Sequence, residues 1–311
     1  MMAHMVERKI IWPAAGSYVV GVSGGIDSMV LLDVLATAPA KRGYRLIVAH
    51  FDHAMRPDSV ADAKFVAEAA RTYNLPFESA RAVTAPASEA QARSARHGFL
   101  RSVVAARPGA RLILAHHQDD AIETSLLNVS RGTGWQGLAP FVGSDITRPL
   151  LLTPRRQIAA YAAHHDVWWR EDETNADLSN PRNLLRREIL PRADGTWQRE
   201  YLELMTRTAQ VGVRLTSKVL NVGTSSATGW QLGRVGVRDL SLEALAGVLV
   251  AHSKRLRPDI ELDRRLVLEL ALFAKIGRPG RHRPVRGKLD LSIGRDGISL
   301  WNLDTAQNEN K

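Results

Sequence analysis

Residues 18–35 read YVVGVSGGIDSMVLLDVL, and this stretch decides the fold. Its first five residues are an apolar run typical of a buried parallel strand. Its last seven, Met29–Leu35, have the length and apolar spacing of a helix packed on that strand. Between them lies a glycine-rich turn, Ser23-Gly24-Gly25-Ile26-Asp27-Ser28. A turn of this kind directs backbone N–H groups and the positive end of a helix at an anion.

Side chains in this turn add groups that suit a magnesium-bound diphosphate. The hydroxyls of Ser23 and Ser28 can donate to phosphate oxygens, and the Asp27 carboxylate offers an oxygen ligand for Mg²⁺. The Gly-Lys of an ordinary P-loop is missing. The turn resembles the pyrophosphate-binding loop of ATP-pyrophosphatases, which implies ATP binding by all six residues: Ser23, Gly24, Gly25, Ile26, Asp27 and Ser28. A Gly-Gly turn with a Ser or Asp helix cap is the simpler structural alternative.

Strand-like and helix-like segments alternate through the first half of the chain. After the first strand we expect strands at 46–50, 77–83 and 111–115, with helices from Ser59, over 88–106 and over 119–130. Repeated units of this length predict an α/β fold, a doubly wound parallel sheet with helices on both faces. Ligands of such sheets bind beyond the carboxyl ends of the strands. The Ser23 turn and the segments after His50 and Ala115 are therefore predicted to meet at one edge.

The length of 311 residues favours two domains. We expect a catalytic domain over residues 1–195, a connecting helix over 196–222 and a small α+β domain over 223–311. The Gly/Ser/Thr-rich stretch 223–229 is typical of a linker. Beyond it, helices are expected over 240–249 and 262–274, and a hairpin over 288–303.

The composition indicates a globular protein with a polyanionic partner. Lys and Arg number 42 against 32 Asp and Glu, a net charge of +10 that is typical of nucleic-acid binding; a basic protein without such a partner is the alternative. No apolar run approaches the roughly 18 residues that cross a bilayer, and the N-terminal residues lack a signal-peptide core, so we expect a cytoplasmic protein without a membrane partner. The absence of cysteine excludes persulfide chemistry and thiolate-bound metal clusters.

Further motifs follow the Ser23 turn in a fixed order. They are His50-Phe51-Asp52-His53-Ala54-Met55-Arg56, His116-His117-Gln118-Asp119-Asp120-Ala121-Ile122-Glu123, Arg148-Pro149-Leu150-Leu151, Glu171-Asp172-Glu173-Thr174-Asn175 and Pro181-Arg182-Asn183-Leu184-Leu185-Arg186. With the turn, they make roughly residues 15–192 resemble the tRNA(Ile)-lysidine synthetase family. The resemblance is to the short form of that family, with one small C-terminal domain.

The resemblance implies a ligase that uses ATP and Mg²⁺. The family adenylates the C2 carbonyl of the wobble cytidine in a CAU-anticodon isoleucine tRNA and releases diphosphate. The ε-amine of free L-lysine then displaces AMP to form lysidine. The implied partners are therefore this tRNA and L-lysine, while the oligomeric state is left open, a homodimer included.

The segment after the fourth expected strand carries a histidine and two carboxylates at helical spacing. His116, Asp120 and Glu123 stand at i, i+4 and i+7, so a helix starting near His116 would place them on one face. Two carboxylates can hold an ammonium group, and one of them or His116 could accept its proton. By the resemblance, these positions line the lysine site and assist catalysis. An acidic first helical turn is the structural alternative, which explains Asp119 and Asp120 only.

Arginines are expected in the site because negative charge builds up on the α-phosphate during adenylation. By the resemblance, Arg93 and Arg186 are catalytic-site residues, one directed to ATP or the adenylate and the other to the RNA. The roles of a further set of polar residues stay open: His50, His53, Arg56, Ser59, Arg96 and Arg187.

Other functions share parts of this pattern. A thiolating relative is excluded because it needs cysteine or an iron–sulfur cluster. An ammonia-using ligase of the NAD-synthetase or GMP-synthetase kind would share the turn, but it would not call for the Lys- and Arg-rich segment 254–288. That segment is predicted to contact tRNA phosphates. A nucleotide-gated RNA-binding protein without catalysis is the third alternative.

Overall fold

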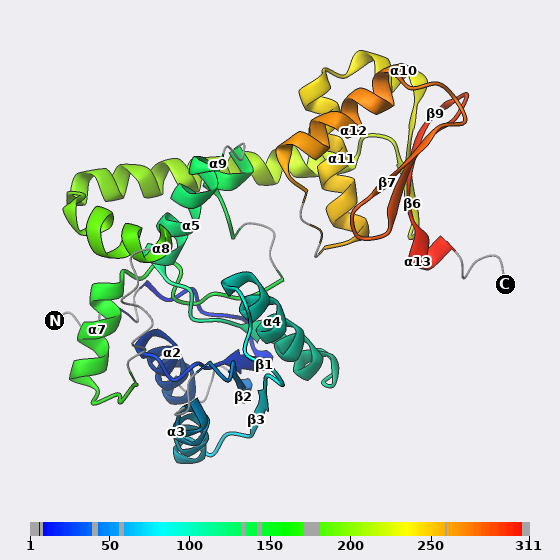
Figure 1. Cartoon of the computed structure of the whole chain (residues 1–311). Helices are drawn as coiled ribbons and strands as arrows, with labels where there is room; N and C mark the ends of the chain where they lie inside the picture. The colour runs from blue at the N-terminus through cyan, green and yellow to red at the C-terminus, as the bar shows by residue number, and fades with distance from the viewer. Residues whose placement is uncertain are drawn as a thin grey trace. The chain divides into compact units, whose positions relative to one another are not determined.

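The chain forms two compact units with separate cores (Figure 1). The computed structural model describes residues 6, 9–38, 43–55, 59–131, 135–141, 145–170, 181–258, 260 and 262–306. Unit 1 comprises residues 1–124 and 143–198, and unit 2 comprises residues 125–142 and 199–311. The predicted functional division at 195 and 222 stays a prediction. Arg56 and the motif Glu171–Asn175 lie outside the described residues.

Unit 1 is built on a four-stranded parallel sheet. Its strands are β1 (Gly16–Gly21), β2 (Tyr44–Asp52), β3 (Phe77–Arg81) and β4 (Arg111–Ile113), in the order β3-β2-β1-β4. Next to the short strand β4, an isolated parallel β-bridge joins Ile113 to Thr147. The predicted α/β fold class is confirmed.

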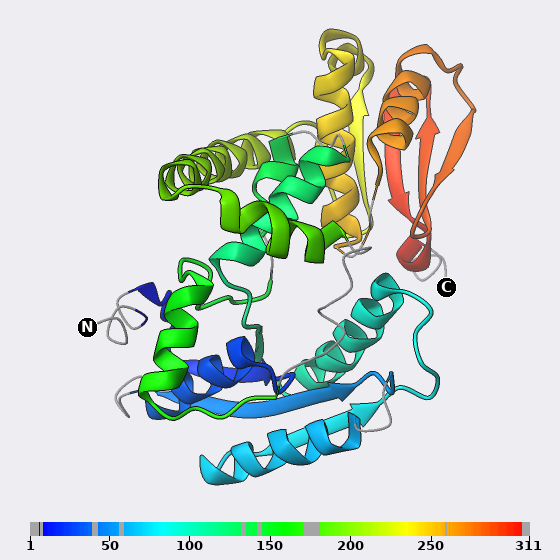
Figure 2. The same ribbon diagram turned by 60° about the vertical axis from the view of Figure 1, so that its left-hand side comes forward.

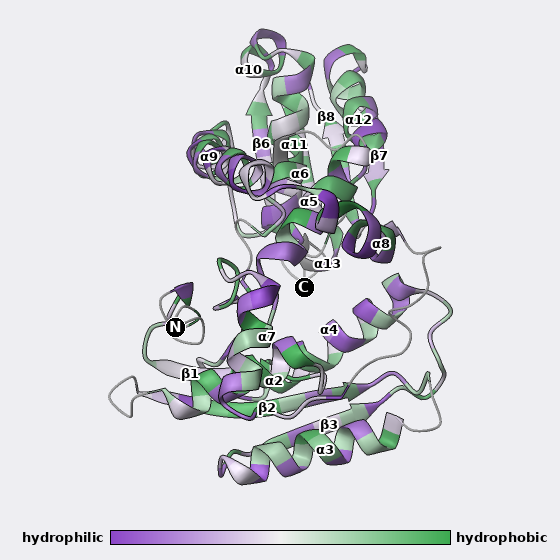
Figure 3. Ribbon diagram, turned by 90° about the vertical axis from the view of Figure 1, so that its left-hand side faces the viewer, coloured by the Kyte–Doolittle hydropathy of each residue, from purple (hydrophilic) through white to green (hydrophobic). Residues whose placement is uncertain are grey.

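Helices cover both faces of this sheet because its strands are apolar on both. Tyr18 and Val20 point into one core with α2 (Ile26–Thr37), α3 (Ser59–Thr72) and α7 (Arg155–His164). Val19 points into a second core under α4 (Glu89–Ala105). Figure 2 shows α3 and α4 on opposite faces, and Figure 3 shows the mixed hydrophobic and hydrophilic residues of the amphipathic α3.

The helices that follow β4 complete unit 1 and begin unit 2. They are α5 (Gln118–Ser130), α6 (Trp135–Leu138), α8 (Pro181–Leu184), a π-helical turn at Leu185–Ile189, a 3₁₀ turn at Leu190–Arg192 and α9 (Gly195–Leu220). Within the described residues, no helix combines the length and apolar character needed to cross a membrane.

Unit 2 is an antiparallel sheet packed against helices, as predicted for a small α+β domain. Its strands are β5 (Thr224–Ser225), β6 (Gly229–Gly233), β7 (His282–Val285), β8 (Leu289–Ile293) and β9 (Gly297–Asn302), in the order β5-β6-β9-β8-β7. Its helices are α10 (Arg234–Asp239), α11 (Leu242–Leu256), α12 (Arg264–Ile276) and α13 (Leu303–Ala306). The predicted hairpin at 288–303 is confirmed as β8 and β9.

The Gly/Ser/Thr-rich stretch 223–229 is not a linker, contrary to the prediction. Thr224 pairs with Gln231 and Ser225 with Trp230, so these two residues form the edge strand β5 and the rest of the stretch makes the turn into β6. The hydroxyl of Ser226 accepts from the backbone N–H of Gly229 at 3.0 Å and closes the turn. The same small polar residues serve tight turns and linkers, so composition alone did not separate them.

Candidate active site

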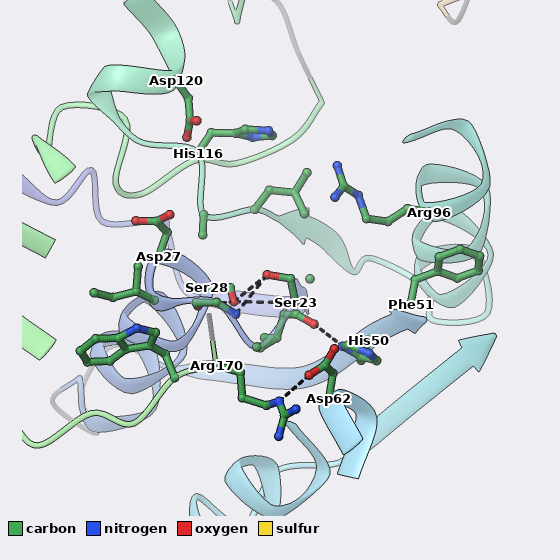
Figure 4. Close-up of a pocket in the computed structure, with 18 of the residues that line it drawn as sticks. Ser23, Asp27, Ser28, His50, Phe51, Asp62, Arg96, His116, Asp120 and Arg170 are labelled. Carbon is green, nitrogen blue, oxygen red and sulfur yellow. Dashed lines mark hydrogen bonds and ion pairs between the residues drawn. The ribbon is translucent and has the colours of Figure 1, made fainter. Parts of the chain in front are cut away.

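The carboxyl ends of β1, β2 and β4 open into one cavity of about 1140 Å³, lined entirely by unit 1. Figure 4 shows Ser23, Asp27 and Ser28 at its base, His116 and Asp120 above them, and Arg96 reaching in from α4. The predicted meeting of three loop segments therefore occurs. Of the predicted site residues, the lining includes the following: Ser23, Gly24, Gly25, Ile26, Asp27, Ser28, Arg93, His116, Asp120 and Arg186.

The glycine-rich turn between β1 and α2 is held by its own side chains. The Ser28 hydroxyl donates to the carbonyl of Gly25 at 2.9 Å and accepts from the backbone N–H of Ser23 at 3.1 Å. Gly24 has φ +93°, a region that side-chain-bearing residues rarely adopt. Arg170, which is not part of the turn, donates its backbone N–H to the Gly24 carbonyl at 3.0 Å. Its side chain pairs with Asp62 at 2.5 Å. The turn is therefore fixed in shape before any ligand arrives.

Asp27 is the carboxylate of this turn. Its Oδ2 lies 3.6 Å from Nε2 of His117, and its buried Oδ1 has no hydrogen-bond partner among the described residues. Burial raises the pKa of Asp27, but the hydrogen bond and charge of His117, with Arg155 and Arg186, bring it below 3.8. An ionised carboxylate with an unsatisfied buried oxygen beside a phosphate-type loop is suited to a divalent cation.

His117 connects this turn to α5. It is 1% exposed, and its Nε2 lies 3.4 Å from Oδ2 of Asp120 as well as near Asp27. Burial lowers the pKa of His117, whereas the hydrogen bond to Asp27 and the charges of Asp120, Asp27 and Asp119 raise it above 6.5. His117 was not among the predicted site residues. The adjacent histidines of the His116-His117 pair were the signal available, but spacing alone does not tell which of them turns inward.

The helix that carries the carboxylates starts one residue before the predicted range 119–130, and not near His116 as the placement of His116 on its face required. It begins at Gln118, and Asp120 Oδ2 accepts from the backbone N–H of His117 at 3.0 Å. The backbone N–H of Asp120 donates in return to Nδ1 of His117 at 3.4 Å, which completes a capping-box arrangement with His117 at the N-cap. The helix cannot extend back through the capped residue, so His116 lies in the turn before α5 rather than on its face.

His116 is held by Arg148, which belongs to the Arg148–Leu151 motif and had no predicted role. The Nε of Arg148 donates to Nδ1 of His116 at 3.1 Å, and its NH1 donates to the carbonyl of Ile146 at 3.0 Å. Burial lowers the pKa of His116 to about 3; Asp120 opposes this change, and Arg148, Arg93 and Arg96 reinforce it. His116 is therefore a neutral imidazole at physiological pH.

Glu123 is completely buried and is bound by Arg186. The Nε and NH2 of Arg186 donate to its two oxygens at 2.9 Å each, and the same NH2 donates to Oδ1 of Asp120 at 3.2 Å. Burial raises the pKa of Glu123 above 4.5, although Arg186 partly offsets this effect. Glu123 does not line the cavity; it holds Arg186, which does. The π-helical turn at Leu185–Ile189 presents Arg186 to both carboxylates.

The remaining candidates lie on the other walls. Arg93 and Arg96 line the cavity from α4, and the buried Nε of Arg96 has no hydrogen-bond partner among the described residues. His50, 3% exposed, donates from Nδ1 to the carbonyl of Val22 at 2.9 Å and so ties β2 to the end of β1. His53 and Ser59 also line the cavity. The result is a nucleotide-sized pocket whose lining carries both arginines and carboxylates, the latter including Asp27 and Asp120.

The family model for the PP-loop domain matches residues 2–193, more than half of the chain. The chain belongs to the PP-loop family. The matched region contains the whole cavity lining, so the family accounts for the turn, the sheet and the site that they form.

Several named proteins are similar to this chain in sequence. The tRNA(Ile)-lysidine synthase of Solibacter usitatus is 38% identical over 203 residues, which cover 63% of this chain and 46% of that protein. The enzyme of the same name from Gloeobacter violaceus is 37% identical over 186 residues, covering 58% and 57%. This chain spans about half the length of the curated relatives it matches. Among solved structures, the U34-tRNA thiolase NcsA from Methanococcus maripaludis aligns with a TM-score of 0.49 at 15% identity, over 66% of this chain and 78% of its own.

Proposed function

We propose that this protein is an ATP-dependent ligase that converts the wobble cytidine of CAU-anticodon isoleucine tRNA to lysidine. The observation that carries the proposal is the single cavity in which a PP-loop turn faces His116 and Asp120, in a chain whose curated relatives are tRNA(Ile)-lysidine synthases. A phosphate-binding turn alone would suit many ligases. The carboxylate of Asp120 in the same cavity is what favours an amine as the second substrate.

The first half-reaction uses the turn and the basic wall. The cytosine O2 attacks the α-phosphorus of ATP, and the bond to the departing diphosphate breaks. The backbone N–H groups of the turn and the hydroxyl of Ser23 would bind the diphosphate, since the turn already has the shape that this requires. Arg93, which lines the opposite wall, would stabilise the charge that develops on the α-phosphate.

Mg²⁺ fits the residues present at one position. Asp27 supplies a buried carboxylate oxygen without a hydrogen-bond partner among the described residues, so it would hold the cation against the diphosphate. Bound there, the cation would neutralise charge on the leaving group. Among the described residues, no group of three or more His, Cys, Asp or Glu side chains forms a metal site. The phosphates would therefore supply further ligands.

The second half-reaction uses Asp120, which lines the cavity. The ε-amine of lysine attacks C2 of the adenylated cytosine, AMP leaves, and the amine loses a proton. Asp120 would bind the lysine ammonium before it is deprotonated. Arg186 now occupies Oδ1 of this carboxylate and both oxygens of Glu123, so lysine has to share Asp120 with the guanidinium. Lysine binding is therefore coupled to the position of Arg186.

One assay tests this proposal against the alternatives. The protein is incubated with ATP, Mg²⁺, radiolabelled lysine and either isoleucine tRNA(CAU) or a control tRNA, and both diphosphate and RNA-bound lysine are measured. We expect lysine to be incorporated into the cognate tRNA only. Diphosphate release with ammonia and without RNA would indicate the ammonia-using ligase instead. Tight RNA binding without either product would indicate a non-catalytic RNA-binding protein.

A further inference from the structure

His116 and Arg148 lie 32 residues apart in sequence but share a hydrogen bond at the edge of the cavity. The donor in this bond is fixed by chemistry, because a guanidinium has five N–H groups and no acceptor. Nδ1 of His116 must therefore be the acceptor, and a neutral ring whose Nδ1 accepts carries its hydrogen on Nε2. The tautomer follows from the partner and needs no observed hydrogen atom.

Arg148 is itself held in a fixed place. It is 8% exposed, and its NH1 donates to the carbonyl of Ile146 while its Nε donates to His116. His116 lines the cavity, whereas Arg148 is not among the lining residues. The arginine thus supports the imidazole from outside the cavity.

We propose that Arg148 is a positioning residue that fixes His116 as a neutral imidazole with its hydrogen on Nε2. His116 then donates a hydrogen bond to a carbonyl or phosphate oxygen of the substrate, and it does not accept the proton released by the amine. This second step rests on the proposed function, whereas the tautomer does not. The proton of the amine then passes to a carboxylate; of the two expected to hold the amine, Asp120 and Glu123, Asp120 lines the cavity and Glu123 does not.

The charges around His116 support this assignment. Arg148 faces it from the segment after Thr147, Arg93 and Arg96 from α4, and Asp120 from α5. The three guanidiniums oppose a positive charge on the ring, and Asp120 favours one. Burial acts in the same direction as the arginines, which is why the pKa of His116 falls to about 3.

The direct test is nitrogen NMR of the histidine rings in the free protein, with His116→Gln used to assign the signal. We expect Nδ1 of His116 to be unprotonated, Nε2 to be protonated, and neither to titrate between about pH 5 and pH 8, where an ordinary histidine does. A ring with its hydrogen on Nδ1, or one that becomes charged in this range, would overturn the proposal. No substrate is present, so this result is independent of whether the protein makes lysidine.

Variants test the positioning role. Arg148→Met removes the donor to Nδ1 and should raise the pKa of His116 from about 3 by about one unit, so the ring should no longer hold a single tautomer in the NMR spectrum and the acid limb of the ATP-dependent step should move up in pH by the same amount. Arg148→Lys retains a donor and a positive charge and should keep the wild-type pH profile. Arg101→Gln, which removes an arginine that pairs with Asp145 on the protein surface, is the matched control and should change neither.

The outcomes separate the possible failures. Uniform loss of activity in Arg148→Met, with the shape of the pH profile and the His116 signals unchanged, would show that Arg148 is structural only and would overturn the positioning role. If Arg148→Met does not fold, the wild-type NMR spectrum still tests the tautomer of His116, and Arg148→Lys still tests the positioning role of Arg148. A confirmed tautomer in a protein that incorporates no lysine would reject the proposed function and leave the assignment of Arg148 intact.

Discussion

The two carboxylate oxygens of Asp27 have different surroundings in the site. Its Oδ2 faces His117, and its Oδ1 is buried without a hydrogen-bond partner among the described residues. A buried polar atom that the fold leaves unsatisfied costs stability, so its retention favours a role in binding. The cation and diphosphate of the proposed reaction would satisfy it.

Asp27→Ala should reduce diphosphate release by at least about 100-fold, because the turn loses its only carboxylate. The domain should remain folded, since the substitution removes a group that is only partly satisfied. Diphosphate release and the far-UV circular dichroism spectrum are the measurements. Asp145→Asn, at a carboxylate that is 72% exposed, is the control and should keep both. Near-normal turnover of Asp27→Ala would reject the role assigned to Asp27.

The pair of Glu123 and Arg186 is a second feature at the residue scale. Glu123 is 0% exposed and Arg186 is 28% exposed, and two parallel hydrogen bonds join them. Removing one partner of a fully buried pair costs about 3–5 kcal/mol because the other charge is left without compensation. The partial exposure of Arg186 reduces that figure.

Glu123→Gln and Arg186→Met should each lower the free energy of unfolding by about 2 kcal/mol. The double variant should be destabilised by clearly less than the sum, because neither charge is then left alone. Urea titration of the four proteins in this cycle measures the coupling. Additive losses would mean that the two side chains do not interact in solution. Lysine incorporation should be lost in all three variants, since Arg186 lines the cavity and Glu123 holds it.

At the scale of the element, the N-terminal caps of α5 and α12 differ in their roles. α5 begins after a residue whose backbone N–H is capped by Asp120, and α12 begins after Asp263, whose Oδ1 accepts from the N–H of Leu266 at 2.9 Å. In α5 the capping residue is also a site residue, so the start of the helix and the shape of the cavity are linked. In α12 the cap is structural only.

Asp263→Ala should lower the stability of unit 2 by about 1 kcal/mol, the usual cost of losing an N-cap. Asp263→Asn is the matched control, because asparagine caps equally well, and it should stay within a few tenths of a kcal/mol of the wild type. Because the seven tryptophans of the chain lie in both units, the unfolding of unit 2 is measured by amide hydrogen exchange of α11 and α12. The ATP-dependent step should be unchanged in both variants, since the whole cavity lining belongs to unit 1.

At the scale of the whole molecule, the net charge of +10 is the main signal for an RNA partner. Several basic residues of unit 2 are engaged in ion pairs: Arg257 and Lys288 with Asp304, and Arg265 and Arg283 with Glu269. Arg278 and Arg281 are exposed in the turn before β7. These two are the better candidates for contact with RNA phosphates.

Arg278→Gln and Arg281→Gln should each weaken tRNA binding about equally for cognate and control tRNA. Each should also reduce the slope of log affinity against log salt by about 1, the loss of one phosphate contact. Filter binding over a salt series is the measurement. Arg207→Gln removes an equally exposed arginine that pairs with Glu203 on α9, and it is the control for the change in charge. Salt slopes that match this control would place the RNA contacts elsewhere.

Some features of the site could be predicted because they are local in sequence. The strand, turn and helix of residues 18–35 are contiguous, so apolar spacing and two adjacent glycines were enough to predict the Ser23 turn. The alternation of such units predicted the parallel sheet, and the sheet predicted the edge at which the loops meet. Arg93, His116 and Asp120 line the cavity; Arg93 was expected in the site from the family resemblance, and the roles of all three stay predictions.

The pairings within the site were decided by the tertiary structure alone. Arg148 meets His116 across 32 residues, Arg186 meets Glu123 across 63, and His117 meets Asp27 across the sheet edge. Likewise, Thr224 and Ser225 form an edge strand because β6 pairs with them. Periodicity and local propensity describe neighbours along the chain. Which distant charge faces a given side chain depends on how the layers pack, and that contact sets its pKa, its tautomer and its part in the chemistry.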